Sequence, residues 1–140
     1  MKICVFEDNA NSLMGLSALE NDGYDCWITS DFRDLTEWIV LNPPDFFTAL
    51  IMDLQVPSHS LYFIPECKDY NINIDHSPTL FYIERFLLKK YPEIQEKIIL
   101  CSAYFDKFST NNISLKQVSK SEENPITQLI NALQLLSFES

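Results

Sequence analysis

The chain has 140 residues, of which 46% are hydrophobic, and its 20 acidic side chains outnumber 10 basic ones to give a formal net charge of −10. The length suits one compact domain, and the apolar fraction is ample for a packed core. The negative charge argues against a surface that binds nucleic acid directly, because phosphates would be repelled. A metal ion or a basic face of a partner protein fits this charge better.

Neither hydropathy nor cysteine usage indicates a secreted or membrane protein. No stretch approaches the roughly 20 apolar residues that a membrane-spanning helix needs. The N-terminal MKICVFEDN turns acidic too soon for a signal peptide. The four cysteines are widely spaced and form no CxxC pair: Cys4, Cys26, Cys67 and Cys101. We therefore expect free thiols and a cytoplasmic location, with no membrane span.

Strand-like and helix-like segments alternate along the chain. In chain order, we expect a strand over 2–6, a helix over 11–21, a strand over 25–29, a helix over 31–41, a strand over 49–52, a helix from the Ser77 cap to about Tyr91, strands over 97–101 and 115–119, and a last helix from Pro125. The pairs Ser77-Pro78 and Asn124-Pro125 combine a capping residue with proline at the first helical position. This alternation predicts an α/β fold, a parallel sheet with helices on both faces.

One connection is longer than those in most compact domains. Residues 58–76 show no clear periodicity, so we expect an irregular insertion there. The rest of the pattern fits a single domain over 1–140. The connection from 101 to 115 leaves space only for a short helix around 104–108. The apolar run 61–64 either packs under the domain or contacts a partner. The insertion also contains four residues of zinc-ligand type, but without a recognised spacing, which favours a surface loop: His59, Cys67, Asp75 and His76.

Polar residues follow four of the five predicted strands. Glu7 and Asp8 follow the first strand, Asp53 the third, Ser102 the fourth and Lys120 the fifth. Ligands of an open parallel sheet bind outside the carboxyl ends of its strands. The sequence therefore predicts that three carboxylates, one hydroxyl and one amine converge on one rim of the sheet.

The mixture of groups indicates phosphoryl chemistry. Three crowded carboxylates repel one another unless a cation joins them, and an acidic pocket of oxygen ligands suits Mg²⁺. Asp53 then serves as a carboxylate nucleophile that attacks phosphorus and holds an acyl phosphate. Lys120 and Ser102 would bind two of the phosphoryl oxygens.

At these residues the sequence resembles the receiver domain of two-component response regulators, over nearly the whole chain. The matching motifs are FEDN for the acidic pair, IMDLQVP for the phosphoacceptor and its downstream proline, ILCSA for the hydroxyl residue and VSK for the lysine. The resemblance implies a flavodoxin-like, doubly wound sheet of five parallel strands in the order 2-1-3-4-5. It also implies a single-domain phosphoprotein of the two-component phosphorelay.

The resemblance further implies the site and its partners. Asp53 is the phosphoacceptor for a histidine kinase or phosphotransfer protein, and Mg²⁺ is held by Glu7, Asp8, Asp53 and the backbone carbonyl of Gln55. Ser102 then moves toward the phosphoryl group and changes the surface that a downstream protein target recognises. Such a switch is no dedicated enzyme: at most it phosphorylates itself from a phosphodonor and dephosphorylates itself.

Several positions depart from the receiver pattern. Ser121 replaces the usual proline after the lysine, Gln117 replaces the usual aromatic residue three positions before it, and the segment 58–76 replaces a short loop. The fourth helix is expected to be truncated. Two positions that bear on signal lifetime in the family hold Gln55 and Tyr104, and a bulky Tyr104 would screen the acyl phosphate from water.

Three other classes compete with this interpretation. The first is a degenerate receiver that acts as a constitutive, phosphorylation-independent interaction module; Ser121 and Gln117 favour it, and the intact five-residue site disfavours it. A phosphatase or phosphotransferase of the haloacid-dehalogenase type requires a second acid where Gln55 stands. A flavodoxin-like cofactor binder requires small and glycine residues where EDNANS begins with two acids.

Overall fold

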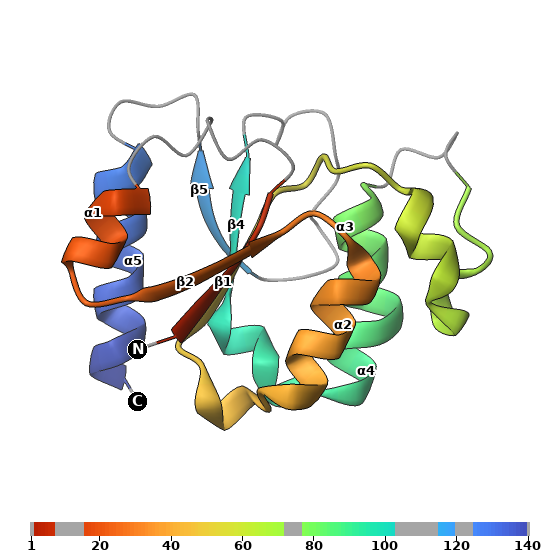
Figure 1. Ribbon diagram of the computed structural model, residues 1–140, viewed down its shortest axis with the longest axis horizontal. Coiled ribbons are helices and arrows are strands. Elements are labelled where there is room, and N and C mark those ends of the chain that lie inside the picture. The colour runs from red at the N-terminus through yellow and green to blue at the C-terminus, as the bar shows by residue number, and fades with distance from the viewer. Residues whose placement is uncertain (1, 8–15, 72–76, 103–114, 120–124, 140) are drawn as a thin grey trace.

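The computed structural model describes residues 2–7, 16–71, 77–102, 115–119 and 125–139. Its centre is a sheet of five parallel strands in the order β2-β1-β3-β4-β5 (Figure 1). The strands are β1 (Lys2–Phe6), β2 (Asp25–Thr29), β3 (Ala49–Met52), β4 (Ile98–Ser102) and β5 (Lys116–Ser119). The predicted flavodoxin-like fold and strand order are confirmed, with β4 lying one residue later than expected.

Helices cover both faces of this sheet. They are α1 (Leu16–Asn21), α2 (Phe32–Leu41), α5 (Pro125–Glu139), and a continuous helical stretch formed by α3 (Pro78–Tyr82), a π-helical turn (Ile83–Leu87) and α4 (Leu88–Lys90). Helices α1 and α5 lie on one side of the sheet, and α2, α3 and α4 lie on the other (Figure 1). Within the described part of the chain, none of the helices combines the length and apolarity needed to cross a bilayer.

Side chains alternate between the two faces of each strand, so the hydrophobic core consists of two clusters, one on each face of the sheet. Along β1, Cys4 and Phe6 pack in the cluster that also contains Leu35 of α2, whereas Ile3 and Val5 pack with the residues of the opposite cluster. Successive side chains of a strand point to opposite faces, so an uninterrupted apolar run is what a strand covered on both faces requires. All five β1 residues except the first are buried.

The helix starts follow their capping signals. The Asp31 carboxylate accepts hydrogen bonds from the amides of Arg33 and Asp34 at the first turn of α2. The Ser77 hydroxyl accepts one from the Leu80 amide, and Pro78 takes the first helical position, as the sequence predicts. The helical stretch then ends at Lys90, just before the predicted end near Tyr91.

The insertion contains local structure where the sequence predicts irregular chain. Two 3₁₀ helices, His59–Phe63 and Pro65–Cys67, pack between α2 and the helical stretch that begins with α3. Of the apolar run 61–64, Leu61 and Ile64 are buried while Tyr62 and Phe63 are exposed. Packing under the domain therefore holds for Leu61 and Ile64, while a partner contact of Tyr62 and Phe63 stays a prediction. Residues 72–76 and the short helix expected around 104–108 lie outside the described residues.

All four cysteines are free thiols, as their spacing predicts. Three of them, Cys4, Cys67 and Cys101, are buried among apolar side chains and act as small hydrophobic residues.

Candidate phosphoacceptor site

Two buried carboxylates lie next to each other at the carboxyl edge of the sheet. Strands β1 and β3 are neighbours, with Phe6 opposite Met52, and each strand is followed directly by an acid, Glu7 or Asp53. Glu7 is 5% exposed and Asp53 is 7% exposed. Two acids in adjacent buried positions attract a cation strongly, because the surrounding protein screens their charge less than water does.

The backbone of both acids is held by the ladder of the sheet. The Asp53 amide donates a 2.9 Å hydrogen bond to the Phe6 carbonyl, and the Glu7 amide donates a 2.9 Å bond to the Thr29 carbonyl. The parallel hydrogen-bonding pattern therefore continues one residue past the ends of β1 and β3. Both side chains start from a rigid backbone, as a preorganised site requires.

Asp53 has two further contacts that orient it. Its Oδ1 accepts a 3.2 Å hydrogen bond from the Gln55 amide, which turns the chain at the end of the strand. Its backbone carbonyl accepts a 2.6 Å hydrogen bond from the Thr79 hydroxyl, which comes from the first turn of α3. Gln55 itself is exposed, two residues after Asp53 in the turn that leaves the strand end.

Because the sheet is parallel, the carboxyl ends of β4 and β5 lie at the same edge as those of β1 and β3 (Figure 1). Ser102 is the last residue of β4 and lies opposite Ser119, the last residue of β5. Lys120 follows Ser119 in the chain and, with Asp8 and Tyr104, lies outside the described residues. Of the predicted site, the structure thus brings together Glu7, Asp53 and Gln55 and places the Ser102 backbone on the same rim.

The donor set of the described residues fits Mg²⁺. This ion binds through one or two carboxylates, other oxygen ligands and several retained waters. Glu7, Asp53 and the Gln55 carbonyl supply oxygen donors of that kind. Among the described residues, no three His, Cys, Asp or Glu side chains group together as metal ligands; of the zinc-type residues, His59 is exposed and Cys67 is buried.

Sequence reasoning missed Thr79, which contacts the candidate phosphoacceptor directly. The Ser77-Pro78 signal locates the start of α3 and so places Thr79 in its first turn. Thr79 and Asp53 are 26 residues apart in the chain, so their contact depends on the tertiary fold. The local sequence carries no signal for such a contact.

Comparisons with known proteins agree with this architecture. No family model and no curated protein sequence matches the chain. Among solved structures, a sensor protein from Polaromonas sp. JS666 is similar with a TM-score of 0.63 and 16% identity, over 99% of this chain and 98% of that one. A CheY-like response regulator receiver domain protein from Methanospirillum hungatei JF-1 is similar with a TM-score of 0.57 and 18% identity, over the same shares of the two chains.

At these identities the likeness concerns the fold. The chain has the fold of a response-regulator receiver domain along nearly its whole length. The resemblance that the sequence motifs indicate is confirmed at this level.

Proposed function

We propose that this protein is a response-regulator receiver, a switch that accepts a phosphoryl group on Asp53 from a histidine kinase or phosphotransfer protein in an Mg²⁺-dependent reaction. The observation that supports it most is the buried pair Glu7 and Asp53, on adjacent strands at the carboxyl edge of a receiver fold. A buried pair of acids adds little to stability by itself, so its position at a ligand-binding edge favours a functional role.

The reaction follows from the nucleophile and its surroundings. A carboxylate oxygen of Asp53 attacks the phosphorus of phosphohistidine, a P–O bond forms, and the P–N bond breaks as the imidazole leaves with the electron pair and is protonated. Bound Mg²⁺ would neutralise charge on the phosphoryl oxygens, and Glu7, Asp8, Asp53 and the Gln55 carbonyl would hold it. The Gln55 amide donates to Oδ1 of the Asp53 carboxylate and keeps this group oriented.

Two groups complete the proposed site. Lys120, next in the chain after β5, would pair with one phosphoryl oxygen, and the Ser102 hydroxyl would donate a hydrogen bond to another. Movement of Ser102 toward the phosphoryl group would alter the neighbouring surface and so change affinity for a downstream protein. We place this exchange in the cytoplasm, where kinases of this class present their phosphohistidine.

A degenerate receiver that binds partners without phosphorylation is the second candidate. Gln117, an exposed residue of β5, favours it, because it stands where receivers commonly carry the aromatic side chain that transmits the signal. The two candidates differ in a single property, the ability of Asp53 to accept a phosphoryl group.

Intact-mass measurement after incubation with Mg²⁺ and phosphoramidate tests that property. We expect one phosphoryl-sized gain in the wild-type protein, none in the Asp53→Asn variant, and none when EDTA removes the metal. A gain that persists in Asp53→Asn would place the acceptor elsewhere. No gain in the wild type, either from phosphoramidate or from a phosphorylated histidine phosphotransfer protein, would favour the degenerate module.

A further inference from the structure

The contact between Thr79 and Asp53 joins the first turn of α3, the helix that follows the insertion, to the candidate phosphoacceptor. The Thr79 side chain is fully buried, and its hydroxyl donates a 2.6 Å hydrogen bond to the Asp53 backbone carbonyl. On its other side, the Asp53 amide donates to the Phe6 carbonyl of β1. The peptide groups that flank the Asp53 Cα are therefore held by two different elements, β1 and α3.

This bond is not needed to form the helix. At the start of α3, the Ser77 hydroxyl accepts from the Leu80 amide and caps the helix. A threonine inside a helix can bond its hydroxyl to a carbonyl of the preceding turn, but Thr79 is the second residue of α3 and has no preceding turn of this helix. Thr79 instead donates to a residue 26 positions away, so its hydroxyl acts on the strand end rather than on the helix.

The position of the bond suits control of the site geometry. The Asp53 carbonyl lies in the peptide plane between Asp53 and Leu54, in the turn that carries both the Asp53 carboxylate and the Gln55 carbonyl. Leu54 is fully buried and Gln55 is exposed, so this turn passes from the core to the surface. A rotation of this peptide would displace both oxygen donors together, and displacements of about 1 Å at a reacting centre are costly.

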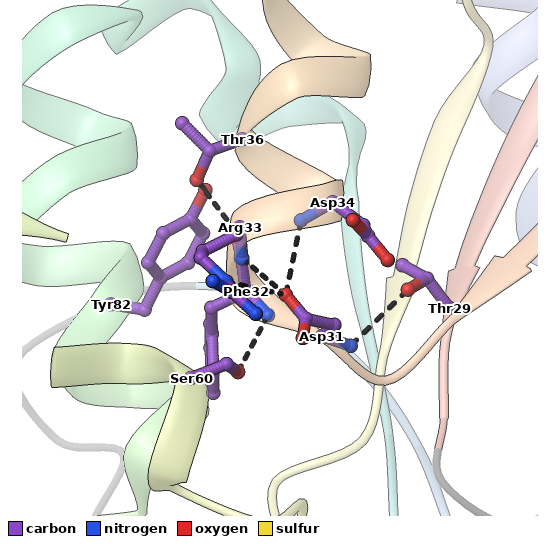
Figure 2. A network of polar contacts seen from close by, with 8 residues as sticks. All are labelled: Thr29, Asp31, Phe32, Arg33, Asp34, Thr36, Ser60 and Tyr82. Carbon is purple, nitrogen blue, oxygen red and sulfur yellow. Dashed lines mark hydrogen bonds and ion pairs between the residues drawn. The ribbon is translucent and has the colours of Figure 1, made fainter. Parts of the chain in front are cut away.

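The insertion, in turn, contacts both α2 and the helical stretch that begins with α3. Figure 2 shows Ser60 beside the first turn of α2, where its buried hydroxyl accepts a 2.9 Å hydrogen bond from the Phe32 amide. Asp69 of the insertion also forms an ion pair, at 3.3 Å, with Arg85 in the π-helical turn that follows α3. Helices α2 and α3 are also joined directly, since Thr36 and Tyr82 share a 2.7 Å hydrogen bond between their hydroxyls.

We propose that Thr79 is a positioning residue for phosphorylation, which holds the Asp53–Gln55 turn in its reactive geometry and couples it to the insertion. This role rests on the proposed function of Asp53. It assigns the insertion a purpose: the segment sets the helix whose first turn orients the phosphoacceptor. A partner that displaces the insertion would thereby change the reactivity of Asp53.

The test compares two substitutions of Thr79 with one matched control. Thr79→Val removes the hydroxyl and keeps the shape, whereas Thr79→Ser keeps the hydroxyl. Thr48→Val is the control, because it removes a hydroxyl just before β3, at the end of that strand opposite Asp53. Phosphorylation by phosphoramidate is followed by intact mass across a series of Mg²⁺ concentrations, and Mg²⁺ affinity is measured separately from the amide NMR shift of Gln55.

We expect Thr79→Val to slow phosphorylation and weaken Mg²⁺ binding by about tenfold together, the order expected when a positioning contact is lost. Thr79→Ser should restore both to near the wild-type values, and Thr48→Val should leave both unchanged. Equal rates and affinities in wild type and Thr79→Val would overturn the positioning role while leaving the proposed function intact.

Two other outcomes also decide against the role. A folded Thr79→Ser that is as slow as Thr79→Val would show that the hydroxyl is not the determinant. If Thr79→Val and a second variant, Thr79→Ala, both lack native circular dichroism, the residue is structural and the proposal fails. A wild-type protein that neither takes up phosphoryl groups nor binds Mg²⁺ would instead refute the proposed function, and the positioning role with it.

Discussion

Removal of one buried hydroxyl, in Ser60→Ala, should weaken the attachment of the insertion to α2. Ser60 is fully buried, and its hydroxyl accepts a hydrogen bond from the amide of Phe32, the first residue of α2 (Figure 2). The Phe32 side chain is also fully buried. The helix cap does not replace this acceptor, because the Asp31 carboxylate bonds to the amides of Arg33 and Asp34. The substitution therefore leaves a buried donor without the partner that it has in the native structure.

The expected loss follows from the cost of that orphaned group. A buried donor that loses its acceptor costs about 1–3 kcal/mol, whereas the cavity left by one oxygen atom contributes little. Since a domain of this size is stable by only about 5–15 kcal/mol, the loss should be a measurable fraction of the total.

Urea unfolding followed by tryptophan fluorescence is a suitable assay. Trp38 of α2 stacks on Trp27 of β2 with ring centroids 5.5 Å apart, so separation of this helix from the sheet should change the emission. Ser58→Ala is the matched control, because Ser58 precedes the same 3₁₀ helix and makes no side-chain capping bond there. Coincident midpoints for Ser60→Ala and Ser58→Ala would refute the argument that the hydroxyl ties the two elements together.

Three further predictions address the signal lifetime, the insertion core and the thiols. Tyr104→Ala should shorten the half-life of the acyl phosphate, measured by loss of the phosphorylated mass; an unchanged half-life would contradict the screening role. Leu61→Ala should lower the free energy of unfolding by about 2–5 kcal/mol, because this side chain is fully buried, while Tyr62→Ala should cost far less; equal thermal shifts would contradict the division of the run 61–64. Burial, together with the negative charges of Glu20 and Asp25, raises the pKa of the Cys26 thiol to about 11. Reaction of Cys26 with a disulfide reagent should therefore quicken about tenfold per pH unit from pH 8 to 10, since the thiolate is the nucleophile, and a plateau near pH 9 would refute this.

The sequence by itself determines the architecture, because the signals for it are local. The short apolar strands, the Asp31 and Ser77 caps and the proline after Ser77 each act within a few residues of chain. Alternating strands and helices then restrict the topology, and a parallel sheet brings the ends of its strands to one edge. Glu7 and Asp53 are found from sequence for that reason: each follows a buried strand directly.

Only the tertiary structure decides how the insertion relates to the site. The insertion has no hydrophobic periodicity in its sequence. Leu61 is buried and Phe63 is exposed because of how the insertion packs on α2. The bonds from Ser60 to Phe32 and from Thr79 to Asp53 span 28 and 26 residues. A hydroxyl has no sequence preference for a partner so far away; it bonds to whichever buried polar group the folded chain places beside it, because an unsatisfied one would be costly.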